Sequence, residues 1–174
     1  MQMKLHWQKH LREEEKYNMK IVVFSDTHGK INSAIDIINK QNPDMIIHLG
    51  DFVRDAEDLR SVFTDIKIEY VAGNNDFYMN VLSEKIISIQ NKKILLTHGH
   101  NYRIKHGLES IIIKGQQEEV DVVLFGHTHK AYENIENNIL YFNPGSLTLP
   151  YEKPSYGLIE IKNNKIYSMI CSLK

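Results

Sequence analysis

The stretch Ile21-Val22-Val23-Phe24-Ser25-Asp26-Thr27-His28-Gly29 decides the fold, because an apolar run passes directly into a polar cluster. The first four residues are β-branched or aromatic, which is typical of a strand buried on both faces. After the polar cluster, apolar residues recur at helical spacing at Ile31, Ile35 and Ile38. The pattern predicts a strand over residues 21–24 and a helix over residues 32–40 that packs on a sheet.

The same alternation of strand and helix continues along the first half of the chain. Residues 45–49 and 66–71 are predicted strands, and residues 55–63 form a predicted helix between them. Strands that alternate with helices indicate parallel strands joined by right-handed crossovers. The first half therefore predicts a parallel sheet.

The second half is predicted to be a run of antiparallel pairs. Three pairs of apolar runs flank short polar turns, at residues 85–89 and 92–97, 134–136 and 139–142, and 156–161 and 165–170. The turn residues Gln90-Asn91, Asn137-Asn138 and Asn163-Asn164 are typical of hairpins. A helix over residues 104–117 and a buried strand over residues 120–125 lie between these pairs. Two sheets and several helices in one chain predict a layered α/β sandwich.

Composition narrows the class of protein. The chain has 174 residues, enough for one domain with a sizeable core, and its 42% hydrophobic and 25% charged residues are ordinary for a globular protein. The net charge of -1 gives no overall basic field, so nucleic acid is not indicated as a partner. No apolar run approaches the ~20 residues of a membrane span. The one cysteine, Cys171, fits a small apolar residue in a final strand, and we expect a cytoplasmic protein.

Residues 1–18 differ in character from the rest of the chain. They are mostly polar or charged and contain no apolar core of a secretory signal. We expect residues 1–18 to be a non-native extension and residues 19–174 to be the functional domain, with Met19 as the natural start. The alternative is a native N-terminal helix around residues 11–16.

Five polar clusters follow predicted strands and together carry the chemistry. Ligands in α/β sheets bind beyond the carboxyl ends of strands, which is where these clusters lie. Neutral imidazoles, carboxylates and an amide oxygen suit divalent manganese, zinc, iron or nickel. Within Asp26-Thr27-His28 and His127-Thr128-His129, alternate residues of an extended segment would point to one centre. The clusters are Asp26-Thr27-His28, Gly50-Asp51, Gly73-Asn74-Asn75-Asp76, His98-Gly99-His100 and Gly126-His127-Thr128-His129.

Each cluster alone also has an ordinary structural interpretation. Asp26 or Asp51 could cap the helix that follows it, and Gly73-Asn74 is a common turn pair. His98 or His127 could be a hydrogen-bonded histidine at a strand end. The occurrence of all five in order favours a two-metal centre over five separate structural explanations.

With these motifs, the chain resembles the calcineurin-like metallophosphoesterases over residues 19–174. The family carries D-x-H, G-D, G-N, a G-H or H-G-H segment and G-H-x-H in this order. Asn143-Pro144-Gly145-Ser146 further resembles a segment of its small single-domain bacterial and archaeal phosphodiesterases. The resemblance implies a four-layer α-β-β-α sandwich with two mixed β-sheets.

The resemblance also implies a set of metal ligands. One ion would take Asp26, His28 and His129, a second would take Asn74, His98 and His127, and Asp51 would bridge both. Two divalent ions, manganese first and nickel, iron or zinc as alternatives, would activate a hydroxide for attack on a small phosphodiester or organic phosphate. The alternatives are a phosphomonoesterase or protein phosphatase, and a non-catalytic interaction scaffold like the retromer subunit of this fold. The scaffold predicts lost ligands, whereas this chain keeps all seven.

Three further residues are assigned to the catalytic surroundings. Many family members have a histidine where this chain has Asn75, and an amide cannot act as a general acid near neutral pH. His100 could supply the missing proton or phosphate contact, or could instead orient a ligand. Asp76 is expected to position a ligand, with a solvent-facing residue as the alternative. Asn143 and Ser146 are expected to hold the ligand loop, and a homodimer through an exposed strand or loop stays open.

Overall fold

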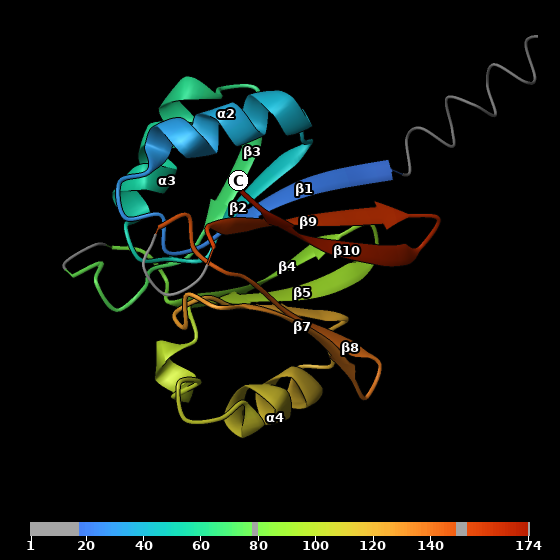
Figure 1. Ribbon diagram of the computed structural model, residues 1–174. Helices are drawn as coiled ribbons and strands as arrows, with labels where there is room; N and C mark the ends of the chain where they lie inside the picture. Colours follow the sequence, from blue (N-terminus) through green and yellow to red (C-terminus); the bar gives the residue numbers. More distant parts are fainter. Residues whose placement is uncertain (1–17, 78–79, 149–152, 174) are drawn as a thin grey trace, which may run out of the picture.

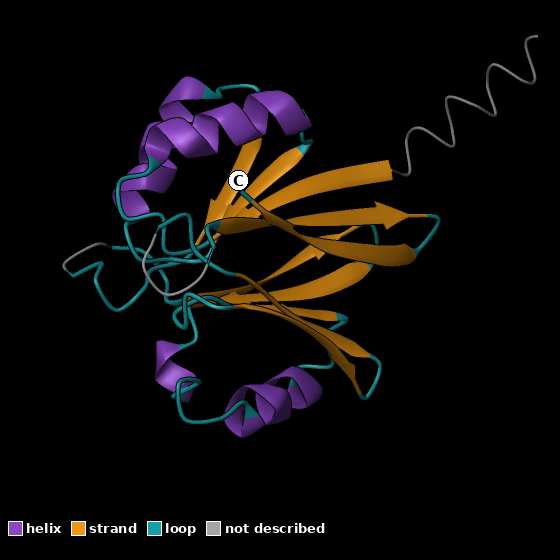
Figure 2. Ribbon diagram, in the orientation of Figure 1, coloured by secondary structure: helices purple, strands orange, loops and turns teal. Residues whose placement is uncertain are grey.

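The computed structural model describes residues 18–77, 80–148 and 153–173. Two five-stranded sheets pack face to face, α2 and α3 cover the outer face of one sheet, and α4 covers the outer face of the other (Figures 1 and 2). This arrangement is the four-layer sandwich that the sequence predicts. Residues 1–17 lie outside the described ranges, so the expectation for the N-terminal extension stays a prediction. Among the described helices, none is long and apolar enough to cross a membrane.

The first sheet, sheet A, has the strand order β10-β9-β1-β2-β3. Strands β1 (Asn18–Phe24), β2 (Met45–His48) and β3 (Lys67–Tyr70) run parallel, joined by helices α2 (Ile31–Gln41) and α3 (Val53–Val62). The predicted β-α-β-α-β order is confirmed. Strands β9 (Ser155–Lys162) and β10 (Lys165–Ser172) add the C-terminal hairpin antiparallel to β1.

The second sheet, sheet B, has the order β4-β5-β6-β8-β7. Its hairpins are β4 (Glu84–Ile89) with β5 (Lys92–Thr97) and β7 (Ala131–Glu136) with β8 (Ile139–Pro144). The predicted antiparallel pairs are confirmed, and the sheet is mixed because β6 (Val122–Leu124) runs parallel to both β5 and β8, a pairing that the hairpin pattern alone does not predict. The chain reaches β6 through α4 (Glu109–Gln117), and a helical crossover returns the next strand in the same direction.

The three predicted hairpin turns are confirmed by their backbone. Both residues of each turn are left-handed, with φ of 47° and 65° in Gln90-Asn91, 52° and 64° in Asn137-Asn138, and 51° and 61° in Asn163-Asn164. Two consecutive positive φ angles belong to the type I′ turn, whose twist matches that of the flanking strands. Asparagine tolerates this conformation better than most residues, which explains its repeated use.

The core consists of three apolar layers that follow the alternation of strand residues. Ile21 and Val23 of β1 face the second sheet, whereas Val22 and Phe24 face the helices α2 and α3. All four are fully buried. A third cluster lies between sheet B and α4. Burial on both faces explains why the sequences of the central strands are unbroken apolar runs.

The predicted helix over residues 104–117 is wrong in its first part. A short 3-10 helix, His100–Tyr102, comes first, and Arg103 then turns into the left-handed region with φ of 52°. The buried side chain of Ile104 packs on Gly99, where its Cδ1 would lie 2.4 Å from an added Cβ. Regular helix begins only at Glu109. The apolar residues at 104 and 108 fit helical spacing, but Ile104 is placed by this turn.

Candidate metal centre

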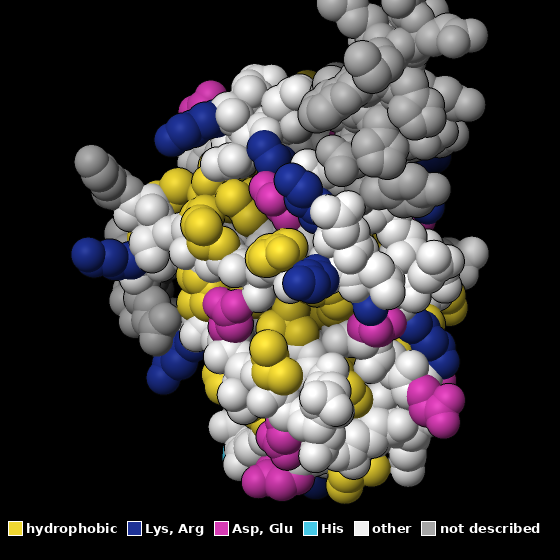
Figure 3. Space-filling model, turned by 90° about the vertical axis from the view of Figure 1, so that its right-hand side faces the viewer, with side chains coloured by type: hydrophobic (Ala, Val, Ile, Leu, Met, Phe, Trp, Pro, Cys, Tyr) yellow, Lys and Arg dark blue, Asp and Glu magenta, His cyan; other side chains and the backbone are white. Residues whose placement is uncertain are grey.

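The polar clusters meet where strands of both sheets end at the same edge of the sandwich. Asp26 and Asp51 follow β1 and β2 of sheet A, whereas His98 and His127 follow β5 and β6 of sheet B. The opposite end of the molecule shows hydrophobic side chains among lysines, arginines and acidic residues, with no gathering of histidines (Figure 3). The predicted ligands that follow these strands are therefore gathered at one end of the sandwich.

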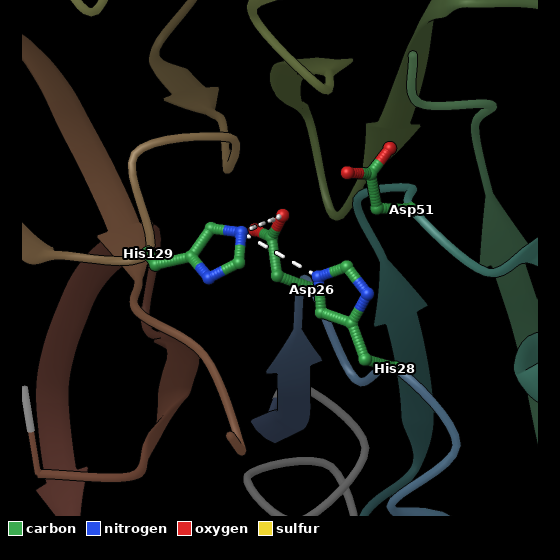
Figure 4. Close-up of side chains that lie close together, drawn as sticks. All are labelled: Asp26, His28, Asp51 and His129. Carbon is green, nitrogen blue, oxygen red and sulfur yellow. Dashed lines mark hydrogen bonds and ion pairs between the residues drawn. The ribbon is translucent and has the colours of Figure 1, made fainter. Parts of the chain in front are cut away.

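Four of the predicted ligands form a compact group. One donor atom from each of Asp26, His28, Asp51 and His129 lies within 4.8 Å of the other three. His129 Nε2 is 3.1 Å from Asp26 Oδ1 and 3.5 Å from His28 Nε2 (Figure 4). Such a group of carboxylates and imidazoles can hold a divalent cation.

His98 and His127 extend this group on the side of sheet B. His98 Nε2 lies 3.3 Å from Asp51 Oδ1 and 3.9 Å from Asp26 Oδ1. The rings of His98 and His127 have centroids 5.0 Å apart, and the ring of His100 is 5.5 Å from that of His98. Asp51 thus has imidazoles of both sheets near it, the position that a bridging carboxylate requires.

Asn74, the remaining predicted ligand, lies in the loop after β3. Its side-chain amide donates to Asn75 Oδ1 over 3.2 Å. Its own carbonyl oxygen, Oδ1, is buried and accepts no hydrogen bond within the described part of the chain. That oxygen is the atom that an asparagine offers to a cation.

The ligand side chains meet through a backbone conformation that differs from the one predicted from the sequence. The prediction of extended D-x-H and H-x-H segments is wrong, because all four end residues are left-handed, with φ of 53° at Asp26, 44° at His28, 67° at His127 and 59° at His129. Each left-handed residue costs ~1 kcal/mol or more, and such strain concentrates at functional sites. The strained turns bring both side chains of each pair back to the strand ends.

Two glycines allow ligand loops to touch, Gly126 between the two sheets and Gly73 within sheet A. An added Cβ at Gly126 would lie 1.8 Å from Ser25 Oγ, and one at Gly73 would lie 2.2 Å from Asp51 Oδ1. Neither distance is compatible with any larger side chain unless the loops move apart. The glycines that precede the ligands therefore permit close contact between ligand loops.

Buried polar atoms without hydrogen bonds indicate that this centre fits a cation. Asp26 Oδ1 and His98 Nε2 are both buried and make no hydrogen bond among the described residues. The ring of His98 has a fixed orientation, because its Nδ1 lies 2.8 Å from the carbonyl oxygen of Leu49, which can only accept. In the neutral ring the Nε2 lone pair therefore faces carboxylates, an arrangement that a divalent ion between them stabilises.

The charges of the site act on the pKa values of its members. Burial lowers the pKa of His98, but the contact with Asp51 and the charge of Asp26 outweigh burial and raise that pKa. Burial raises the pKa of Asp51, but His98 and the backbone N–H of Asn75 outweigh it, so the pKa lies well below its usual value. Without a metal, the carboxylates thus hold a proton on His98, and a bound cation would replace it.

His127 and His100 are in a different electrostatic situation. Burial, His98 and the ammonium group of Lys105 lower the pKa of His127 to about 4. Burial and the charge of His98 lower the pKa of His100. Both imidazoles are therefore neutral at pH 7, and neutral imidazole is the form that binds metals or donates a single hydrogen bond.

Asn75 and Asp76 tie the loop after β3 to the centre. Asn75 donates to both carboxylate oxygens of Asp51, from its backbone N–H over 3.0 Å and from Nδ2 over 2.7 Å. Asp76 accepts from the backbone N–H groups of Phe52, Val53 and Gly73 at 2.9, 2.7 and 2.8 Å. Asp76 therefore caps α3 and orients the Asp51 loop, and its carboxylate points into backbone amides. This arrangement supports a positioning role for Asp76.

The alternative that Asp26 and Asp51 cap helices is not supported. The N-cap residues of α2 and α3 are Lys30 and Phe52, and neither helix start has a side-chain hydrogen bond from its N-cap residue. Asp26 Oδ2 instead accepts from Ser25 Oγ over 2.6 Å and from the backbone N–H of His127 over 3.0 Å.

A buried chain of Asp55, Thr27 and His48 supports the centre, and sequence analysis missed two of its members. Thr27 Oγ1 donates to Asp55 Oδ2 over 2.6 Å, so it must accept from His48 Nε2, 2.9 Å away. His48 Nδ1 then accepts from the backbone N–H of Gly50 over 3.3 Å. His48 is therefore a fully buried supporting residue. The sequence offers one signal for Thr27, its place between two ligands.

The segment Asn143-Pro144-Gly145-Ser146 holds two ligand loops, as predicted. Asn143 Nδ2 donates to the carbonyl oxygen of Gly126 over 2.9 Å and to Thr128 Oγ1 over 3.0 Å. Ser146 Oγ donates to the carbonyl oxygen of Asp26 over 2.7 Å. His106 is exposed and Cys171 lies half-buried in β10, also as predicted. His6, His10, Tyr78 and Tyr151 lie outside the described residues.

Comparisons with known proteins agree with this geometry. Residues 19–164 match the model of the calcineurin-like phosphoesterase superfamily domain. A probable metallophosphoesterase of Mycoplasma genitalium is 37% identical over 146 residues, which cover 79% of this chain and 85% of that protein. A phosphodiesterase of Methanocaldococcus jannaschii is 34% identical over 146 residues, covering 73% of this chain and 83% of that protein.

A solved structure extends the similarity to three dimensions. A predicted phosphoesterase from Streptococcus pneumoniae superposes with a TM-score of 0.77 at 27% identity. The superposition covers 89% of this chain and 90% of that chain. The fold is therefore shared with a predicted phosphoesterase, and the family match spans the residues of all five polar clusters.

Proposed function

Because the chain belongs to the calcineurin-like phosphoesterase superfamily, we propose that it is a metal-dependent phosphodiesterase acting on small phosphodiesters. The observation that carries the proposal is the group Asp26, His28, Asp51 and His129, whose donor atoms lie within 4.8 Å of one another. The phosphodiesterase among the relatives supports the choice of a diester.

We assign two divalent ions to this centre. Asp26, His28 and His129 would hold one ion, Asn74, His98 and His127 would hold the other, and Asp51 would contact both. When bound, such a pair supplies Lewis acidity and an activated water for attack on phosphorus. Manganese is the ion to test first. The overall reaction consumes one water, breaks one P–O ester bond, and releases a monoester and an alcohol.

The chain's own residues prepare this centre before substrate arrives. Asn75 holds both oxygens of Asp51, and the Leu49 carbonyl fixes the ring of His98. His100 lies beside the rings of both His98 and His127, with centroids 5.5 and 6.1 Å away. As a neutral imidazole it can donate one hydrogen bond to a phosphate oxygen, and we assign it that contact. Preorganised donors of this kind favour the developing charge of the transition state.

Two cavities beside the centre support a substrate with two ester groups. A larger one includes Thr128, between His127 and His129, and has a volume of about 520 Å³. A smaller one of about 190 Å³ includes Asn75, which is bonded to Asp51. A phosphodiester places one substituent on each side of its phosphorus, and these cavities could accept them.

We also propose a cytoplasmic location, because a chain with a single cysteine forms no disulfide within itself and so fits a reducing compartment.

Hydrolysis of bis-p-nitrophenyl phosphate with manganese, then with excess chelator, tests the proposal. We expect turnover that chelator abolishes and that manganese restores. The matched controls are Asp51→Asn, which should be inactive, and Asp58→Asn on the exposed face of α3, which should behave as wild type. Turnover of p-nitrophenyl phosphate alone would favour the phosphomonoesterase. No turnover above the Asp51→Asn variant would favour the scaffold.

A further inference from the structure

The larger cavity has a chemical character that the hydrolytic chemistry itself does not explain. Its wall is apolar, formed by Ile104, Leu108, Phe125, Ala131 and Tyr132. The volume of about 520 Å³ lies in the range typical of small-molecule sites. The half-buried Tyr132 contributes an aromatic ring to the lining, against which a flat group can stack, and the buried ring of Phe125 supports it with its centroid 6.0 Å away.

Two lysines complete the lining. Lys105 and Lys130 are both exposed, and the lining contains no acidic residue among the described side chains. Lys130 directly follows His129, and the charge of Lys105 contributes to the lowered pKa of His127. Both lysines thus line the cavity on the side of His127 and His129. An apolar wall lined by two cationic residues is complementary to an apolar group that carries a negative charge.

The loops that frame the cavity are held firmly. Thr128 Oγ1 accepts from Asn143 Nδ2 over 3.0 Å and from the backbone N–H of Lys130 over 3.3 Å. Phe125 and Ile104 are buried, with 1% and 4% of their surface exposed. The cavity is therefore framed by core residues and a hydrogen-bonded ligand loop.

We propose that this cavity binds one ester group of the substrate, and that this group is flat, apolar and anionic. The substrate class would then be phosphodiesters in which an aromatic or similarly flat substituent carries a second negative charge. Lys105 and Lys130 would act as specificity residues that recognise this charge. This inference rests on the proposed function for its place in a reaction, but the binding preference of the cavity does not depend on turnover.

Two diesters with the same leaving group test the preference for charge. The first is 4-nitrophenyl phenyl phosphate, and the second is 4-nitrophenyl 4-carboxyphenyl phosphate, which differs by one carboxylate. We expect wild-type protein to favour the carboxylate ester by about tenfold in kcat/KM, mainly through KM. The double variant Lys105→Gln with Lys130→Gln should lose this preference, so that its ratio of rates on the two esters falls to about one. Lys165→Gln, an exposed lysine of β10, is the matched control and should change neither rate.

A binding experiment without metal separates this inference from the proposed function. In excess chelator, calorimetry should show naphthalene-2-sulfonate binding to wild-type protein about tenfold more tightly than to the double lysine variant. Ala131→Leu, which narrows the cavity and keeps both lysines, should weaken the same binding, provided that its melting temperature matches wild type. Equal affinity of wild type and both variants would overturn the inference, even if metal-dependent hydrolysis is observed. Absence of hydrolysis with lysine-dependent sulfonate binding would reject the enzyme and keep the anionic aryl site.

Discussion

The two sheets contribute differently to the metal centre. Sheet A supplies both carboxylates, Asp26 and Asp51, which are 0% and 3% exposed and are held by backbone and side-chain hydrogen bonds. Sheet B supplies three of the four imidazoles, of which only His98 is fully buried. Asp51 is therefore held from within sheet A by Asn75, whereas Asp26 also depends on the backbone N–H of His127 from sheet B, so the site becomes complete only when the two sheets pack.

This comparison explains why ligand residues lie so far apart in the sequence. Residues from loops after β1 and β6 meet across the interface, as in the 3.0 Å bond between the His127 N–H and Asp26 Oδ2. Sheet A supplies four of the seven predicted ligands and sheet B supplies three. Changes at the interface should thus affect metal binding and folding together, while changes within one side should affect them separately.

The largest effect is expected for Asp51, the residue contacted by ligand loops of both sheets. Asp51→Asn should lower metal-dependent hydrolysis of bis-p-nitrophenyl phosphate roughly a thousandfold, or about 4 kcal/mol, because it removes the charge shared by both ions. Initial rates at saturating manganese measure this effect. A loss below tenfold would show that the two sides of the centre work independently of Asp51.

The next prediction concerns the loss of folding stability at acidic pH that a residue of sheet A causes. Burial, although opposed by the charges of Asp55 and Asp26, lowers the pKa of His48 to about 4. The unfolded chain takes up this proton near pH 6.5, so the stabilisation present above that pH is lost as the pH falls towards 4. His48→Gln should remove about 3 kcal/mol of this pH dependence.

Denaturant unfolding at pH 7 and pH 4, in chelator, measures the dependence. His106→Gln is the matched control, since His106 is exposed and should leave the pH dependence unchanged. An identical loss of stability in wild type and His48→Gln would contradict the neutral, hydrogen-bonded state of His48.

A third prediction addresses the contact between the sheets. In Gly126→Ala the new Cβ would lie 1.8 Å from Ser25 Oγ, so the variant should lose about 2 kcal/mol of stability. The same substitution in a Ser25→Gly background should cost less, because the two closest clashing atoms are gone and only Asp26 Oδ2, at 2.9 Å, remains. Urea unfolding of the four proteins gives the coupling. An equal cost in both backgrounds would mean that the loops are not in contact.

The smallest effect is expected at Asn75, which touches the centre from the side of sheet A alone. Asn75→His supplies a group that can protonate a leaving alcohol but loses the bond from Nδ2 to Asp51. We expect a gain of about tenfold on alkyl esters and little change on nitrophenyl esters. Equal changes in kcat/KM on both kinds of ester would show that protonation of the leaving group does not limit the rate.

The two sheets also differ in how much of their structure can be predicted from the sequence. The parallel strands of sheet A and the Asn-containing turns are predictable, because each depends on local periodicity or local backbone preference. The parallel placement of β6 is not, since it depends on which strands meet after the α4 crossover. The left-handed turns at Asp26 and His127 are equally invisible, because the surrounding fold imposes them against local preference.

The residues that support the metal centre are harder to predict from the sequence than the ligands themselves. The seven ligand-type residues stand in recognisable motifs, but Asp55 lies in α3 and reaches Thr27 only through the packing of that helix. The motif around Asp76 predicts a positioning role, yet the bonds of Asp76 to the start of α3 depend on two loops meeting. Long-range contacts of this kind leave no periodic signal.

Metal analysis of the purified full chain after manganese loading and gel filtration is the most direct test of the joint centre. We predict close to two manganese ions per chain in wild-type protein and a marked loss in Asp51→Asn. Wild-type protein that retains no more manganese than Asp51→Asn would contradict a centre built jointly by the two sheets.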